Sequence, residues 1–78
     1  MSRRDRVHVL TALADAAHAE IGVGVPIAVI DRAIGRGAGD MRTPLDLEGL
    51  QADGLVAPMT DGSWALTQAG VERLREDL

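Results

Sequence analysis

The fold of this chain is decided by the stretch from residue 47 to residue 67, which reads Leu47-Glu48-Gly49-Leu50-Gln51-Ala52-Asp53-Gly54-Leu55-Val56-Ala57-Pro58-Met59-Thr60-Asp61-Gly62-Ser63-Trp64-Ala65-Leu66-Thr67. Gly54 ends a helix, because glycine readily takes the left-handed conformation that closes one. The residues up to Met59 are extended, and Asp61-Gly62 is typical of the two-residue turn that joins hairpin strands. Thr67 is placed to cap a final helix. The stretch therefore predicts a helix, a hairpin and a second helix.

The residues before this stretch predict a long first helix and a short extended segment. The helix covers about 3–19, and its apolar residues recur at helical spacing at Val7, Leu10, Leu13, Ala14 and Ala17. In the segment 21–25, glycine alternates with β-branched residues, which favours an extended conformation.

A second and a third helix follow. The second opens with Pro26, a residue favoured at the start of a helix, and its apolar stripe consists of Ile27, Ile30 and Ile34. Asp31 and Arg32 are expected to face solvent, and the glycine-rich segment 35–39 ends the helix. The third helix begins with Thr43-Pro44, a cap followed by proline, and runs to about Asp53.

The faces of the third helix follow from steps of about 100° per residue. Leu47 and Leu50 point to the core, and Asp46 and Gln51 lie on the flanks. The outward residues are Leu45, Glu48, Gly49 and Ala52. Glycine costs about 1 kcal/mol relative to alanine inside a helix. Two explanations of Gly49 stay open: close packing against one of the first two helices, or a flat contact surface for a partner.

The pattern L-x-x-L-x-x-x-G-L-V … D-G … W-x-L-T-x-x-G resembles the winged helix-turn-helix family of transcription regulators. It is carried by Leu47, Leu50, Gly54, Leu55, Val56, Asp61, Gly62, Trp64, Leu66, Thr67 and Gly70. The resemblance covers nearly the whole chain and implies one domain, 1–78, that is mainly α with a small β-hairpin (α+β): a three-helix core, a β-wing and a C-terminal helix. In this family the segment at 21–25 often joins the hairpin as a third strand. Winged helices bind DNA, RNA or other proteins, so the fold alone does not fix the function.

Composition limits the function classes. The 78 residues suffice for one domain, contain no cysteine, and carry a formal net charge of −4, with 12 acidic residues and arginine as the only strong base. No apolar run reaches the roughly 20 residues of a membrane span, so we expect a cytoplasmic protein that binds no membrane. Catalysis, a metal ion and a cofactor are not expected. No nucleophile lies in a recognisable motif, and His8 and His18 lie nearly three helical turns apart.

The arginines are the candidate contacts to double-stranded DNA. Arg36 and Arg42 flank the loop before the third helix and are a candidate pair for anchoring phosphate. The resemblance implies that this loop and the start of that helix touch phosphates, which assigns that role to Arg42 and Thr43 by position. Arg3, Arg4 and Arg6 cluster at the N-terminus and are a candidate arm. The planar guanidinium group suits phosphate oxygens, and Gln51 is the one base-reading side chain of the third helix. The alternative is that these arginines serve solubility and surface ion pairs.

Two functions from different classes stay open. The first is a DNA-binding transcription regulator of winged-helix type, acting as a homodimer. The second is a protein-protein interaction module, or a subunit of a larger assembly, that does not bind DNA. Net negative charge, a wing whose only charged residue is Asp61, and the acidic and apolar third helix favour the second. Its expected partner surface includes Leu45 and Leu78, and the first and last helices are expected to supply any dimer contact.

Overall fold

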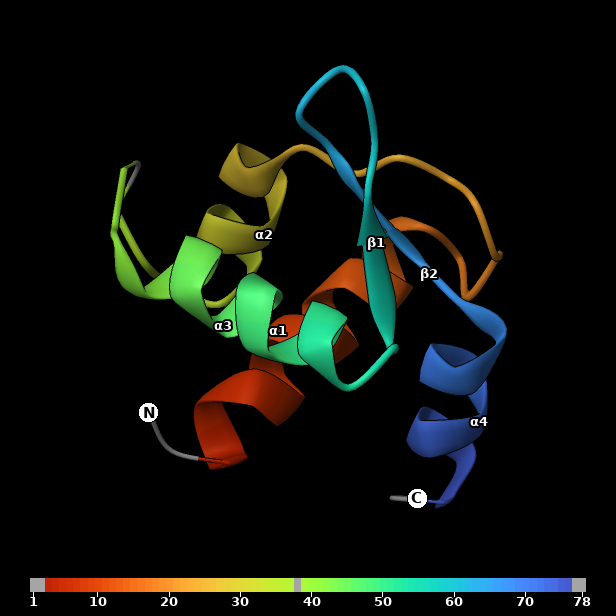
Figure 1. Ribbon diagram of the computed structural model, residues 1–78. Coiled ribbons are helices and arrows are strands. Elements are labelled where there is room, and N and C mark those ends of the chain that lie inside the picture. Colours follow the sequence, from red (N-terminus) through yellow and green to blue (C-terminus); the bar gives the residue numbers. More distant parts are fainter. Residues whose placement is uncertain (1–2, 38, 77–78) are drawn as a thin grey trace.

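The computed structural model describes residues 3–37 and 39–76. Its elements are, in order, α1 (Arg3–Ala16), α2 (Ile27–Ala33), α3 (Arg42–Ala52), β1 (Val56–Pro58), β2 (Trp64–Leu66) and α4 (Gln68–Glu76). In Figure 1, α2 and α3 lie to the left of the hairpin and α4 lies below it. The fold is mainly helical with a small antiparallel hairpin, in a winged-helix layout, as the sequence predicts.

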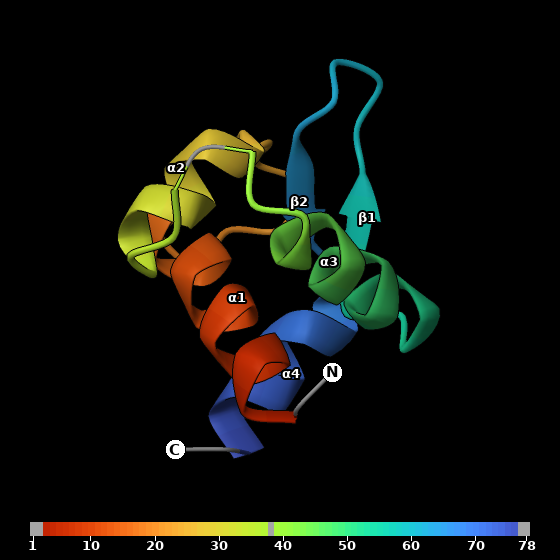
Figure 2. The same ribbon diagram turned by 90° about the vertical axis from the view of Figure 1, so that its left-hand side faces the viewer.

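α1 forms the centre of the core. It contacts α2, α3, α4 and β2, and Figure 2 shows it between α2 and α3. Seven predicted core residues are buried, namely Leu10, Ile30, Leu47, Leu50, Leu55, Trp64 and Leu66. The other four, Ile27, Ile34, Val71 and Leu74, are partly buried and pack against that cluster. Val7 is only partly buried, whereas Val9, absent from the predicted stripe of this helix, is completely buried.

The hairpin pairs β1 with β2, and its turn is longer than predicted. Pro58 lies opposite Trp64, and the Met59 N–H donates to the Ser63 carbonyl at 2.8 Å. The loop therefore consists of 60–62, and Gly62 alone has a positive φ, of 88°. The predicted two-residue turn at Asp61-Gly62 is wrong in length, because a type I′ turn needs positive φ at both central residues.

The segment 21–25 joins the free side of β2. The N–H groups of Val25 and Trp64 each donate to the other residue's carbonyl, at 2.8 and 2.9 Å, and Ile21 forms a further bridge to Leu66. The expected third strand is thus present as two isolated bridges. β1 keeps an unpaired edge in the two-stranded sheet, which is where Pro58 is tolerated.

Three helix boundaries differ from the prediction. α1 ends at Ala16, before the expected Ala19, because His18 and Ala19 adopt positive φ values of 55° and 58°. Pro26 is the N-cap of α2, one position before its first helical residue. α3 begins at Arg42 with Met41 as its N-cap, so Thr43 lies inside the first turn and does not cap it.

Two predicted helix ends are confirmed. Gly54 has a φ of 77° directly after α3, and the N–H of Leu55 donates to the Leu50 carbonyl at 2.9 Å. At the start of α4, the Gly70 N–H donates to the Thr67 hydroxyl oxygen at 3.1 Å. The same hydroxyl donates to the Gly54 carbonyl at 2.6 Å. Thr67 therefore caps α4 and ties its start to the end of α3.

Candidate functional site

A buried polar cluster holds α3 against α2 and the loop between them. Asp31, Thr43 and Asp46 are almost completely buried. The Thr43 hydroxyl donates to Asp31 Oδ1 at 2.5 Å. One guanidinium nitrogen of Arg36 donates to Thr43 Oγ1 and to Asp46 Oδ2, each at 3.0 Å. Four polar side chains from α2, α3 and the loop between them thus form one hydrogen-bonded network.

Arg36 supplies the positive charge of this cluster. Its side chain is only 9% exposed, and its second terminal nitrogen lies 3.9 Å from Asp5. Asp31 Oδ2 and Asp46 Oδ1 have no hydrogen-bond partner among the described residues. Burying a carboxylate is unfavourable unless a cation compensates it. The network therefore depends on Arg36 more than on any other member.

The cluster corrects several expectations. Asp31 does not face solvent and Asp46 does not lie on an exposed flank; both are buried. Arg36 and Thr43, predicted to contact phosphate, bind side chains of this chain in the structure, and their contact with phosphate stays a prediction. The physical reason is that α2 and α3 bring two carboxylates into one buried space, where a cation and a hydroxyl are needed.

Arg42 is exposed but carries its own counterion. Its side chain is 63% exposed, and its Nε and one terminal nitrogen donate to the two carboxylate oxygens of Asp40, at 3.1 and 2.7 Å. The backbone N–H of Arg42 also donates to Asp40 Oδ1, at 2.9 Å. These hydrogen bonds hold the pKa of Asp40 well below its usual range, and Asp40 raises the pKa of Arg42.

Arg6 lies against α3, a position that the sequence does not predict. A Cβ atom built on Gly49 would lie 2.8 Å from both Cζ and Nε of Arg6, so the guanidinium lies directly over the glycine. Arg6 also lies 3.9 Å from Asp53. Gly49 thus makes room for close packing against α1, the first of the two explanations left open. The sequence signal is the glycine inside a helix.

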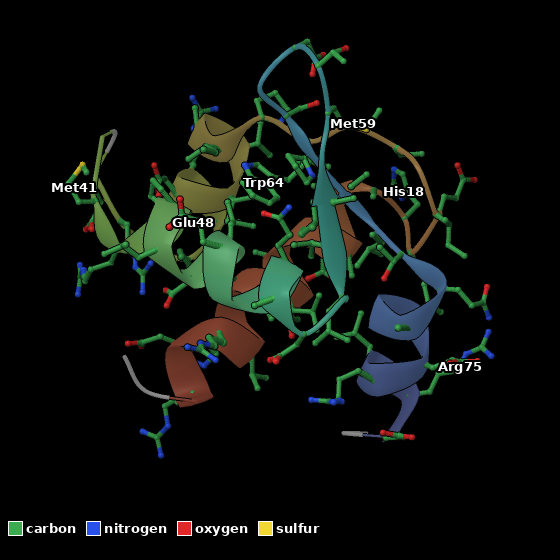
Figure 3. All side chains as sticks on the ribbon, viewed as in Figure 1. His18, Met41, Glu48, Met59, Trp64 and Arg75 are labelled. Atoms are coloured by element: carbon green, nitrogen blue, oxygen red, sulfur yellow. The ribbon has the colours of Figure 1, made fainter. Side chains whose placement is uncertain are left out.

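The outward face of α3 is apolar and acidic. Met41 is 72% exposed and Leu45 is 48% exposed. Glu48 and Ala52 are also exposed, and Figure 3 shows Met41 and Glu48 on this part of the molecule. Glu48 forms no hydrogen bond or ion pair within the part of the chain that the structure describes. We call Met41, Leu45, Glu48 and Ala52 the outer stripe.

The wing offers no cation. Asp61 is its one charged residue, and its Oδ1 accepts hydrogen bonds from the Ser63 hydroxyl at 2.6 Å and the Ser63 N–H at 3.0 Å. These bonds lower the pKa of Asp61. Trp64 is buried in the core and so presents little surface for stacking on a base. The wing therefore offers no positive charge to a phosphate group.

The remaining predicted site residues are Gln51, Arg4, Arg3 and Leu78. Gln51 and Arg4 are exposed. Arg3 is the first residue of α1, and Leu78 lies outside the described residues. Of the arginines next to α3, Arg6, Arg36 and Arg42 each lie within 4.0 Å of an aspartate of this chain.

Two further features bear on possible ligands. Among residues 3–37 and 39–76, no three histidine or carboxylate side chains are arranged to hold a metal ion. None of the helices in the described ranges has the length and apolar character needed to cross a bilayer.

Comparisons with protein families, curated proteins and solved structures find no significant match to this chain.

Proposed function

We propose that this chain is a winged-helix domain that serves as a protein-interaction module and binds its partner through the outer stripe of α3. The proposal rests on how charged side chains are arranged around α3. The three arginines beside the helix are matched by aspartates of the same chain. The surface that a winged helix would present to DNA instead offers Met41, Leu45 and Glu48, and Glu48 has no ion pair among the described residues.

The charges and the exposed apolar side chains favour protein binding over DNA binding. Affinity for DNA comes largely from cations that replace the counterions of phosphates. To bind a phosphate, an arginine that is already paired with an aspartate must release that aspartate. Otherwise the negative charge of the aspartate is brought close to the phosphate. Exposed apolar side chains that form a contiguous patch are typical of protein contact sites. The net charge of −4 adds to the repulsion of DNA.

The DNA-binding regulator remains the second candidate, because Arg42, Arg4 and Gln51 are exposed. In this candidate, Arg42 exchanges Asp40 for a phosphate oxygen, and Gln51 reads a base edge from the side of α3.

Photo-crosslinking from the outer stripe tests the proposed function. A photoreactive amino acid in place of Leu45 should capture a specific protein in cells of the source organism. The same amino acid in place of Glu72, an exposed residue of α4, is the matched control and should not capture that protein. Equal capture from both positions, or capture of nothing at position 45, would count against the interaction module.

A further inference from the structure

The outer stripe has the spacing of a helix-packing seam. Its members are separated by four, three and four residues, from Met41 to Leu45, Glu48 and Ala52. This is the spacing of the a and d positions of a heptad, which face a partner helix. The long apolar side chains of Met41 and Leu45 lie at the N-terminal end of the seam, and the small Ala52 lies at the other end.

One charge interrupts this apolar seam. Glu48 lies between Leu45 and Ala52, is exposed, and has no ion pair among the described residues. The nearby Asp40 and Asp53 are different, because each lies within 4.0 Å of an arginine. A partner that covers the seam removes water from the Glu48 carboxylate, which is unfavourable unless the partner supplies a cation.

The same carboxylate argues against a second copy of this chain as the occupant. Two copies that dock through their outer stripes would bring two Glu48 carboxylates into one interface, where like charges destabilise the complex. The net charge of −4 on each copy would add long-range repulsion. The occupant that fits is a different polypeptide with apolar and basic side chains.

We propose that the outer stripe binds an amphipathic helix of another protein, whose apolar face carries one lysine or arginine opposite Glu48. This inference rests on the proposed function and specifies the partner. Recognition then combines apolar contact at Met41 and Leu45 with one charge-assisted pair, which sets the register of the two helices.

Two synthetic helical peptides test this proposal. They share the same apolar face and differ only in carrying lysine or glutamate at its centre. We expect the lysine peptide to bind the intact chain about tenfold more tightly or better, because the glutamate peptide leaves Glu48 without a cation. Amide shifts in a two-dimensional NMR titration should be largest for residues 41–52.

Reversal of the charge at position 48 is the second part of this test. Glu48→Lys should reverse the preference, so that the glutamate peptide binds more tightly. Glu72→Lys makes the same change of net charge on α4, away from the stripe, and should keep the original preference. Equal binding of the two peptides, a preference that survives Glu48→Lys, or no binding of either peptide would overturn the proposed partner. Crosslinking from position 45 reports separately on the proposed function, so the two failures can be told apart.

Discussion

Arg36 and Asp46 form an ion pair of 3.0 Å that joins the loop after α2 to the buried side of α3. The pair is almost closed to solvent, and Thr43 extends it to Asp31. α3 is therefore oriented by a polar network as well as by Leu47 and Leu50. This network occupies Arg36, one of the predicted phosphate contacts, and leaves the outer stripe exposed on α3 together with Arg42 and Gln51.

The first prediction concerns the stability that Arg36 provides. Arg36→Met should lower the free energy of unfolding by about 3–5 kcal/mol, because it leaves the buried Asp46 carboxylate without its cation and removes the guanidinium donor from Thr43. Urea unfolding followed by the fluorescence of Trp64 measures the loss. Arg36→Met combined with Asp46→Leu should recover part of it, since one uncompensated carboxylate is then gone. If Arg36→Met lowers the free energy of unfolding by less than about 1 kcal/mol, which is the range of a surface ion pair, the network does not hold α3 in place.

The second prediction concerns Gly49 and Arg6. In an Arg6→Ala background, Gly49→Ala should raise the free energy of unfolding by up to about 1 kcal/mol, because alanine is the better helix former. In the otherwise unchanged chain the gain should be smaller, since the new Cβ displaces the guanidinium that lies over Gly49. Urea unfolding of the four proteins in the cycle measures this coupling. Strictly additive effects would show that Arg6 does not lie over Gly49.

The third prediction concerns the cap of α4. Thr67→Val keeps the shape of the side chain but removes the hydroxyl that accepts from Gly70 and donates to Gly54. The free energy of unfolding should fall by about 1–2 kcal/mol. Thr67→Ser keeps the hydroxyl and should lose less. If valine and serine prove equally stable in thermal unfolding, the hydroxyl is not the stabilising group.

The fourth prediction concerns pH. Asp40 has a folded-state pKa below its ordinary value of 3.8, so its pairing with Arg42 stabilises the folded chain above that value. The contribution is lost as the pH falls from about 4 toward the lower folded-state pKa. The stability difference between the original chain and Asp40→Asn should be constant near neutral pH and shrink below about pH 4. An NMR titration of the Asp40 carboxyl carbon with its midpoint at or above 3.8 would contradict this account.

Local rules were sufficient for most of the fold. The chain reversal after α3 follows from Gly54, and the cap of α4 from Thr67, because each depends on neighbours close in sequence. The hairpin was placed correctly, but its turn contains one residue more, since the choice between Asp-Gly turn types depends on how β1 and β2 pair.

The site was less predictable because it depends on contacts between separate elements. Asp31 and Asp46 look like solvent-facing residues when each helix is considered alone, and only the packing of α2 on α3 buries them. Arg36 then turns inward, where it donates to Asp46 and to Thr43, which itself donates to Asp31. The outward position of Leu45 and Glu48, in contrast, follows from helix geometry alone and is confirmed. Sequence reasoning therefore identified Leu45, Glu48 and Ala52 of the outer stripe, but it missed Met41 and could not identify which arginines remain available.

A titration of the chain with random-sequence duplex DNA at about 50 mM salt distinguishes a protein-interaction module from a DNA-binding domain, because electrostatic binding to DNA is strong at this salt concentration. For a protein-interaction module, we expect no saturable DNA binding by fluorescence anisotropy, and no NMR shifts on addition of DNA that are confined to α3. The contradicting result is saturable binding that weakens as salt rises toward about 200 mM, with a salt slope that Arg42→Ala reduces by about one. That result would show that Arg42 exchanges Asp40 for phosphate and that the chain acts as a DNA-binding domain.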